Sequence, residues 1–259
     1  MNVTSVTNPA SRDITIYSVA ACPYAQRTRI LLGLKNINAR LVELDLSKKR
    51  PDWFLAINPA GKVPAIVHGG KPLNESTVIN EYLEEIFPHP PLFPADPYRK
   101  AFSRILIDYC NNSLTTNMYR LLMEQDAAKR PRIEAAANRD WIWLDDMLTR
   151  LGPEQDFPFG RFGMTELTYA PFFVRYALNE YFWGFVMPKH LPRVERWRQA
   201  VLHHDAVKVT SLPPDHYIKL YADYALGFAN GAIPPGHDRS ALDPDWSLEQ
   251  RQLPARRVC

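Results

Sequence analysis

The chain has 259 residues, of which 46% are apolar, enough for one large domain or two smaller domains with hydrophobic cores. Lys and Arg number 31 against 28 Asp and Glu, and the resulting charge of +3 is too small an excess to predict nucleic-acid binding. Only three cysteines are present, so no disulfide framework is expected. We find no signal peptide and no apolar run of about 18 residues, and we therefore expect a cytoplasmic protein without a membrane partner.

A strand followed by a helix forms the most informative stretch. The apolar, β-branched run at 14–18 predicts a buried strand. Cys22-Pro23 then opens an amphipathic helix, because proline suits the first helical position. Cys22 therefore becomes the N-cap, with its sulfur facing the free N–H groups of Tyr24 and Ala25 and the positive end of the helix dipole. This environment favours the thiolate, since thiols at helix N-termini can fall from a pKa of about 8.5 to roughly 3.5–7.5.

Two interpretations of Cys22 remain open from this stretch: a reactive thiol, or a small buried apolar residue. Arg27 and Arg29 on the next turn are expected to add to the stabilisation of a thiolate. Position 25 is alanine, so there is no Cys-x-x-Cys pair, and disulfide chemistry requires a thiol from outside. Cys110 and Cys259 are interpreted as a packing residue and a tail residue.

Helices and strands alternate through the rest of the first third. Pro64, inside an apolar run, must occupy a strand start, an edge or a cis bend. The resulting βαβ-α-ββ-α order predicts an α/β thioredoxin-like domain, in which ligands bind where helix N-termini point, here at Cys22 and Ser76. Further strands are expected at 39–45, 63–67 and 71–73, and helices from Pro51 and over 77–87.

No strand pattern follows the proline-rich linker at 89–97, so the second half is predicted to be all-helical. Glu166, at the third position of one helix, offers a partial capping arrangement. The tail contains turn signals and prolines, and it either lies over the body or is partly disordered. Helices are expected at 98–125, 131–151, 163–182, 191–203 and 214–228. The predicted organisation is an irregular arm (1–11), a thioredoxin-like domain (12–88), a linker (89–97), a helical domain (98–228) and an extended tail (229–259).

Four landmarks in this order resemble the cytosolic glutathione transferases, most closely their omega-like, cysteine-type branch. They are CPYAQR at 22–27, Val63-Pro64 before a strand, Glu75-Ser76 at a helix start, and the linker followed by an all-helical half. The chain departs from the family pattern at Gly163, where the second domain often has a Ser or Thr N-cap. Two further stretches resemble the bacterial glutathione lyase of lignin β-aryl-ether catabolism: LSKKRPDW at 46–53, and the run from Trp197 through IKLYADY at 218–224 to NGAIP at 230–234.

The resemblance implies a glutathione site. Glu75 would accept hydrogen bonds from the γ-glutamyl ammonium, while the hydroxyl and N–H of Ser76 would bind its carboxylate. Val63, before a cis proline, would pair with the cysteinyl backbone like an added strand. Arg50 or Lys62 would meet the glycine carboxylate. Helix capping by Glu75-Ser76 and solvated charges at the two basic residues are the competing interpretations. The implied glutathione-binding residues are Tyr24, Arg50, Lys62, Val63, Pro64, Glu75 and Ser76.

A cysteine in the catalytic place of this family implies thiol exchange with glutathione as co-substrate. Cys22 would attack the sulfur of a glutathione conjugate, and a second glutathione would resolve the mixed disulfide. The departing group must be stabilised, which favours hydrophobic aromatic partners such as glutathionyl aryl ketones and quinols. The substrate pocket is expected from the helical half, with Tyr109, Tyr119, Trp183, Tyr217 and Tyr221 as candidates.

Other functions stay open at this stage. A general omega-type thioltransferase or dehydroascorbate reductase fits the same landmarks, and so does a non-catalytic binding protein of the same fold. A homodimer is possible, because dimers are usual in the family. No metal is expected, since His203-His204 has no partner at ligand spacing.

Overall fold

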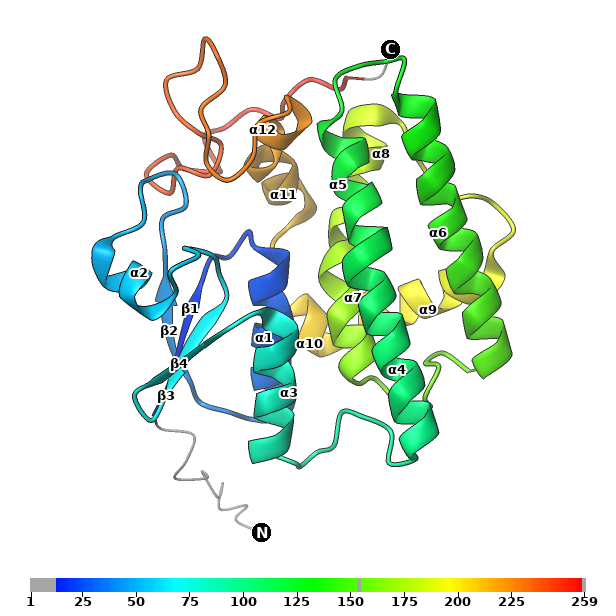
Figure 1. Ribbon diagram of the computed structural model, residues 1–259. Helices are drawn as coiled ribbons and strands as arrows, with labels where there is room; N and C mark the ends of the chain where they lie inside the picture. The colour runs from blue at the N-terminus through cyan, green and yellow to red at the C-terminus, as the bar shows by residue number, and fades with distance from the viewer. Residues whose placement is uncertain (1–12, 153–154, 258–259) are drawn as a thin grey trace.

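The computed structural model describes residues 13–152 and 155–257, which form an α/β half and a helical half side by side (Figure 1). The predicted arm at 1–11 and Cys259 lie outside the described residues. Within those residues, no helix combines the length and apolar character needed to cross a bilayer. The α/β half contains β1 (Ile14–Ser18), α1 (Pro23–Leu34), β2 (Arg40–Glu43), α2 (Asp52–Ile57), β3 (Ala65–His68), β4 (Lys71–Asn74) and α3 (Ser76–Ile86).

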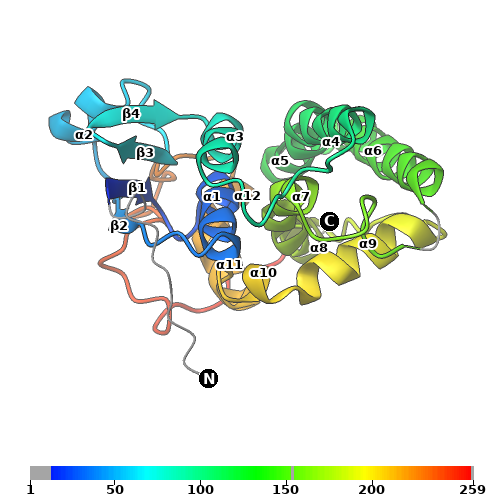
Figure 2. The same cartoon turned by 90° about the horizontal axis from the view of Figure 1, so that it is seen from below.

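The sheet has the order β2-β1-β3-β4, with β1 parallel to β2 and antiparallel to β3, and β3 antiparallel to β4. Ile14 and Ile16 of β1 are buried in the main core, whereas Tyr17 on the other face contacts the rings of Trp53 and Phe54 from α2. Figure 2 shows α1 and α3 between the sheet and the helical half, with α2 on the far side. The predicted βαβ-α-ββ-α order is confirmed.

Strand ends differ from the prediction by one or two residues. β3 begins at Ala65 rather than Val63, because Pro64 has no N–H to give to the ladder; the Val63–Pro64 peptide bond is cis. β2 covers only Arg40–Glu43 of the expected 39–45. The chain around Val63 is therefore loop, which leaves its backbone beside the start of α1.

The helical half also contains more breaks than periodicity predicted. The single helix expected at 98–125 is divided by a π-helical turn, η2, where Tyr109, Ser113 and Asn117 all donate hydrogen bonds to the buried carboxylate of Asp140. The elements are α4 (Pro97–Tyr109), η2 (Cys110–Leu114), α5 (Thr115–Met123), α6 (Arg130–Leu151), α7 (Met164–Arg175), α8 (Ala177–Trp183), α9 (Pro192–His203), α10 (Asp205–Lys208), α11 (Pro214–Leu220) and α12 (Ala222–Ala225).

The two halves meet along α1 and α7, whose contact continues the main hydrophobic core. Phe172 of α7 is buried with its ring edge against Tyr24, 5.6 Å between centroids. In the linker, Leu92 and Phe93 are buried, and both backbone N–H groups donate to Glu84 of α3. The N-terminus of α1 is thereby fixed at the seam between the halves.

The tail lies over the body rather than away from it. Figure 1 shows it running from α12 to the chain before α2 and then returning past α12 toward α8, where the Arg257 N–H donates to the Phe182 carbonyl. Buried Arg251 donates to the carbonyls of Ala241 and Asp243, and the Asp223 carboxylate of α12 accepts from the Ser240 hydroxyl. These contacts fold residues 229–257 into a wall that reaches the seam.

Candidate active site

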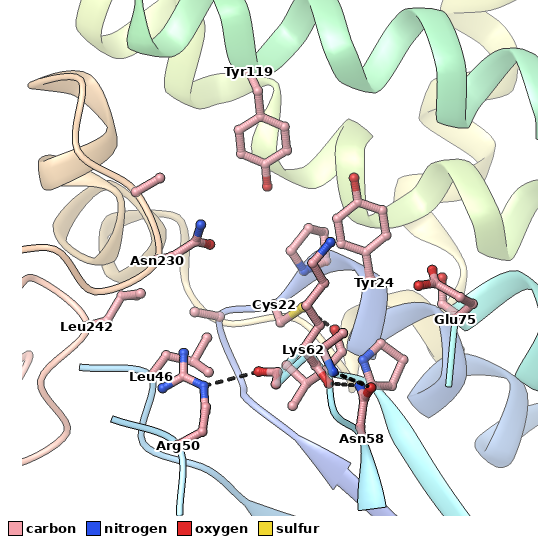
Figure 3. Close-up of a pocket in the computed structure, with 18 of the residues that line it drawn as sticks. Cys22, Tyr24, Leu46, Arg50, Asn58, Lys62, Glu75, Tyr119, Asn230 and Leu242 are labelled. Carbon is pink, nitrogen blue, oxygen red and sulfur yellow. Dashed lines mark hydrogen bonds between the residues drawn. The ribbon is translucent and has the colours of Figure 1, made fainter. Parts of the chain in front are cut away.

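Cys22 takes the predicted N-cap position of α1. Its N–H donates to the Val19 carbonyl over 2.9 Å, which turns the chain from β1 into a helix with Pro23 at the first position. The residue is half-buried and lines a cavity of about 1040 Å³, and its thiol donates to the Val63 carbonyl oxygen 3.5 Å away (Figure 3). The sulfur therefore lies at the start of α1 and also next to Val63, the residue predicted to pair with the backbone of glutathione.

Burial raises the pKa of the Cys22 thiol above its ordinary value, because it disfavours the charged thiolate. The N–H of Ala25, the guanidinium of Arg175, the N–H of Tyr24 and the guanidinium of Arg29 all act in the opposite direction. The helix-start effect is thus present, but the prediction of a lowered pKa is wrong, because burial outweighs it. A thiolate formed here is a minority species at neutral pH, with the higher intrinsic nucleophilicity of a weakly acidic thiol.

Two arginines hold the loop that leads to Cys22. Arg29 of α1 donates to the Ser18 hydroxyl over 2.7 Å and to the carbonyls of residues 19 and 20, each over 3.1 Å. Arg175 of α7 donates to the next carbonyl, that of Ala21, over 2.7 Å. Sequence reasoning missed Arg175, since no local pattern connects residues more than 150 positions apart.

Arg27 does not act on the Cys22 sulfur as expected. Its buried guanidinium donates instead to the Thr168 carbonyl at 2.9 Å, the Ser76 hydroxyl at 3.3 Å and the Cys110 sulfur at 3.5 Å. Arg27 therefore connects the start of α3 to α7 and to Cys110, which is wholly buried and does not line the cavity.

The start of α3 carries Glu75 and Ser76 into the cavity, as predicted. Glu75 has a φ of 67°, an uncommon conformation for a residue with a side chain, and such strain concentrates at ligand sites. Ser76 is buried, and its hydroxyl accepts from Arg27. Since a helix N-terminus attracts anions, this end of the cavity suits a carboxylate.

Arg50 and Lys62 both line the cavity, but their surroundings differ. Arg50 donates to three backbone carbonyls, including that of Gly61 at 3.1 Å, so its guanidinium fixes the loop before Val63. The backbone carbonyl of Lys62 accepts from Asn58 at 2.8 Å. Within the described part of the chain, the Lys62 ammonium has no hydrogen-bond or ion-pair partner, and this charge is available to a ligand.

Tyr119 and Tyr221 extend the cavity into the helical half, as predicted. The Tyr221 hydroxyl accepts from Arg175 and donates to the Ala21 carbonyl, both over 3.0 Å, and lies 3.4 Å from the Tyr119 hydroxyl. Burial raises the pKa of both tyrosines, so both stay protonated at neutral pH. Figure 3 shows Tyr119 pointing toward Cys22 and Tyr24.

Three predicted pocket residues do not line the cavity, and that prediction is wrong for them. Tyr109 donates to Asp140 of α6, Trp183 donates its indole N–H to a carbonyl of α5, and Tyr217 lies 4.3 Å beneath the guanidinium of Arg175. Helical periodicity marks these residues as inward-facing but does not say which inner surface they face.

The cavity also has lining residues that sequence reasoning did not name. Asn230 and Leu242 come from the tail, and Figure 3 shows them across the cavity from Glu75. Gly231 allows this approach, because a Cβ there would overlap the carbonyl oxygen of Leu46. The resemblance of 218–234 to a glutathione lyase was the available signal. Further lining residues are Asn111, Met123 and Tyr224.

Most of the α/β half matches a known protein family. Residues 21–86 match the family model described as "Glutathione S-transferase, N-terminal domain". The chain is similar to the probable glutathione transferase omega-2 of Caenorhabditis elegans, 32% identical over 219 residues, which cover 82% of this chain and 76% of that protein.

Two solved structures extend the likeness to the whole fold. Glutathione transferase Omega 3C from Trametes versicolor is 27% identical with a TM-score of 0.70, covering 82% of this chain and 93% of the fungal one. A rice glutathione transferase solved in complex with glutathione is 27% identical with a TM-score of 0.69, covering 83% and 96%. The region matched by the family model contains Cys22, Val63 and Ser76, the residues on the α/β side of the cavity.

Proposed function

Because the chain belongs to the glutathione transferase family and is omega-like within it, we propose that it removes glutathione from aromatic conjugates by thiol exchange at Cys22. Glutathione is its co-substrate. One observation carries the proposal: the Cys22 sulfur lies at a helix start, at the wall of a cavity that joins polar groups for glutathione to tyrosines for an aromatic partner.

The α/β side of the cavity supplies the contacts that glutathione needs. Ser76 and the N-terminus of α3 bind the γ-glutamyl carboxylate, and Glu75 accepts from its ammonium. Val63 pairs with the cysteinyl backbone. Lys62 meets the glycine carboxylate, because Arg50 already donates to three carbonyls. This docking brings the glutathione sulfur toward Cys22.

The reaction is written for a glutathionyl aryl ketone. The Cys22 thiolate attacks the glutathione sulfur, an S–S bond forms, and the S–C bond breaks with its electron pair leaving on carbon as an enolate. Water supplies the proton that completes the ketone. The thiolate of a second glutathione then attacks the mixed disulfide, which yields oxidised glutathione and the free Cys22 thiolate.

Tyr119 is the residue placed to stabilise the enolate oxygen. The Tyr221 hydroxyl already gives its proton to the Ala21 carbonyl, whereas the Tyr119 hydroxyl faces the cavity and stays protonated. A hydrogen bond to the developing oxyanion strengthens as the S–C bond breaks, which lowers the barrier. Aryl ketones of the kind released in β-aryl-ether cleavage have the oxygen that this arrangement requires.

The decisive assay compares two substrates. We expect the wild-type protein, supplied with glutathione, to cleave a phenacyl thioether of glutathione faster than it reduces a mixed disulfide of glutathione and a small thiol, and Cys22→Ser to do neither. Turnover of the disulfide alone would replace the proposal with a general thioltransferase. Glutathione binding without turnover of either substrate would identify a binding protein.

A homodimer stays a prediction. Exposed apolar side chains from α3 and α4, Val78 and Ile105 among them, flank an ion pair between Glu81 and Arg104. Such a face suits a second copy of the chain. Light scattering during size-exclusion chromatography tests it, with twice 29.8 kDa expected for the dimer.

A further inference from the structure

Arg175 is a buried cation whose hydrogen bonds all end on neutral oxygens. Its side chain is 0% exposed, at the end of α7. It donates to the Ala21 carbonyl and the Gln26 side-chain oxygen over 2.7 Å each, to the Pro171 carbonyl over 2.9 Å and to the Tyr221 hydroxyl over 3.0 Å. Two of these acceptors belong to the segment that carries Cys22.

A charge in the protein interior is costly unless an opposite charge compensates it. Lys35, which is also buried, follows this rule with an ion pair to Glu84 at 2.6 Å. Arg175 has no such pair: in residues 13–152 and 155–257, no carboxylate lies within ion-pair distance of its guanidinium. Buried Arg27 shares this feature, but its donors go to Thr168, Ser76 and Cys110, whereas those of Arg175 go to the segment that carries Cys22. The nearby group that becomes negative during thiol exchange is the sulfur of Cys22.

We propose that Arg175 is a positioning residue for thiol exchange, whose buried guanidinium holds the Ala21–Cys22 junction in place and supplies the positive charge that the Cys22 thiolate requires. This inference rests on the proposed function of Cys22 as the nucleophile. Arg175 is not among the residues that line the cavity, so it acts through Cys22 and the loop rather than on the substrate.

The hydrogen bonds explain how one residue fixes the sulfur. The bond to Ala21 orients the peptide immediately before Cys22, and the bond to Gln26 holds the first turn of α1. Tyr221 bridges Arg175 and the same Ala21 carbonyl, and it lines the cavity. Arg175 therefore holds the chain on both sides of Cys22, the peptide before it and the first turn of α1 after it, and its charge acts on the thiol from there.

Other ionisable groups around the sulfur do not replace this charge. Arg29 also lowers the pKa of Cys22, but Glu43 interacts with it electrostatically. Burial raises the pKa of Tyr24, Tyr119, Tyr221 and Tyr224, so these four stay neutral at physiological pH. The groups facing Cys22 or Arg175 are Tyr24 and Arg29 from α1, Tyr119 from α5, Tyr217 from α11, and Tyr221 and Tyr224 from the segment around α12.

The test is the pH dependence of Cys22 alkylation by iodoacetamide, followed by mass spectrometry of the peptide that contains Cys22. We expect Arg175→Met to move the midpoint upward by about one pH unit or more, equivalent to a tenfold loss of thiolate or greater. Arg175→Lys keeps the charge and should stay within a few tenths of a unit of wild type. Arg193→Met, which removes another buried arginine outside the cavity lining, should titrate like wild type.

An unchanged midpoint in Arg175→Met, with a native circular dichroism spectrum, would overturn the proposal. If that variant does not fold, Arg175→Gln removes the charge while keeping an amide donor for the Ala21 carbonyl. Its exchange rate should fall about tenfold at pH 7, and its Cys22 alkylation midpoint should rise as in Arg175→Met; slower exchange with an unchanged alkylation midpoint would indicate a merely structural role and overturn the proposal. The titration stays informative if Cys22→Ser retains exchange activity, a result that would reject the nucleophile without touching the link between Arg175 and Cys22.

Discussion

The starts of α1 and α7 are made from similar parts but end in different environments. Neither has Ser, Thr, Asp or Asn at the N-cap: α1 begins after Cys22 and α7 after Gly163. At α7, the Glu166 carboxylate turns back to accept from the Gly163 N–H at 2.9 Å and from the Trp197 indole at 3.0 Å, all inside the core. At α1, the first N–H groups face a sulfur that borders the cavity.

The difference shows how one device serves folding or chemistry. A helix start presents unpaired N–H groups and a partial positive charge. When a side chain of the same helix accepts hydrogen bonds from them inside the core, as Glu166 does at α7, the helix start only fixes the chain. We call this a closed start. When they face a cavity, as at α1 and α3, they are available to a thiolate at Cys22 or to a carboxylate at Ser76. We call this an open start. The predictions below test this comparison in order of decreasing expected effect.

The largest effect is expected at the open start of α1. Cys22→Ser should lower thiol exchange by 10³-fold or more, about 4 kcal/mol, because a serine hydroxyl does not form the mixed disulfide. Cys110→Ala is the matched control. Cys110 is wholly buried beside Arg27, so its loss should leave exchange within about twofold of wild type. If Cys22→Ser keeps its exchange activity, the start of α1 does not serve catalysis through Cys22, and the contrast with α7 no longer holds.

The closed start of α7 should make stability depend on pH. Burial raises the pKa of Glu166 from 4.5 to about 7, against the hydrogen bonds from Trp197 and Gly163. Between these values the native protein keeps a proton that the unfolded chain has released, so the free energy of unfolding falls as the pH rises. The Glu166 contribution to this loss is about 3 kcal/mol.

Urea unfolding at pH 5 and pH 7.5 measures this dependence. Glu166→Gln is the comparison variant, because its amide does not titrate and its pH dependence should lack the Glu166 contribution. Equal pH dependence in the two proteins would show that Glu166 is not the titrating group.

The structure explains why the N-cap of α7 is Gly163 rather than the Ser or Thr that is frequent at this position in the family. A Cβ there would overlap the Leu92 carbonyl oxygen, the same oxygen that accepts from the Met164 N–H. Gly163→Ser should therefore destabilise the protein by about 2 kcal/mol, although serine is a better N-cap in isolation. Thermal unfolding checks the sign, and stabilisation by serine would contradict the close approach of the linker.

The local chemistry of the helix starts could be predicted from the sequence. N-cap residues, a proline at the first position and an acidic residue at the third position all act within one helical turn. Cys22, Ser76 and Glu166 were found this way, Glu75 and Arg50 by family position, and Lys62 by its proximity to Val63. The net effect of burial on the Cys22 pKa was not readable, since burial depends on the whole fold. Arg175 was missed for the same reason, and Tyr217 was misplaced because it faces Arg175 instead of the cavity.

The smallest effect is expected at the open start of α3, where Ser76 contributes one hydroxyl to a carboxylate site. Ser76→Ala should weaken glutathione binding about tenfold, the value of one hydrogen bond to a charged group. Ser103→Ala is the control, because Ser103 is equally buried and loses one hydrogen bond to Thr165 away from the cavity. Isothermal titration with glutathione should show a changed Kd only for Ser76→Ala, while thermal unfolding shows similar destabilisation of both variants. If the two bind glutathione equally well, Ser76 only caps α3, and the start of α3 belongs with the closed start of α7.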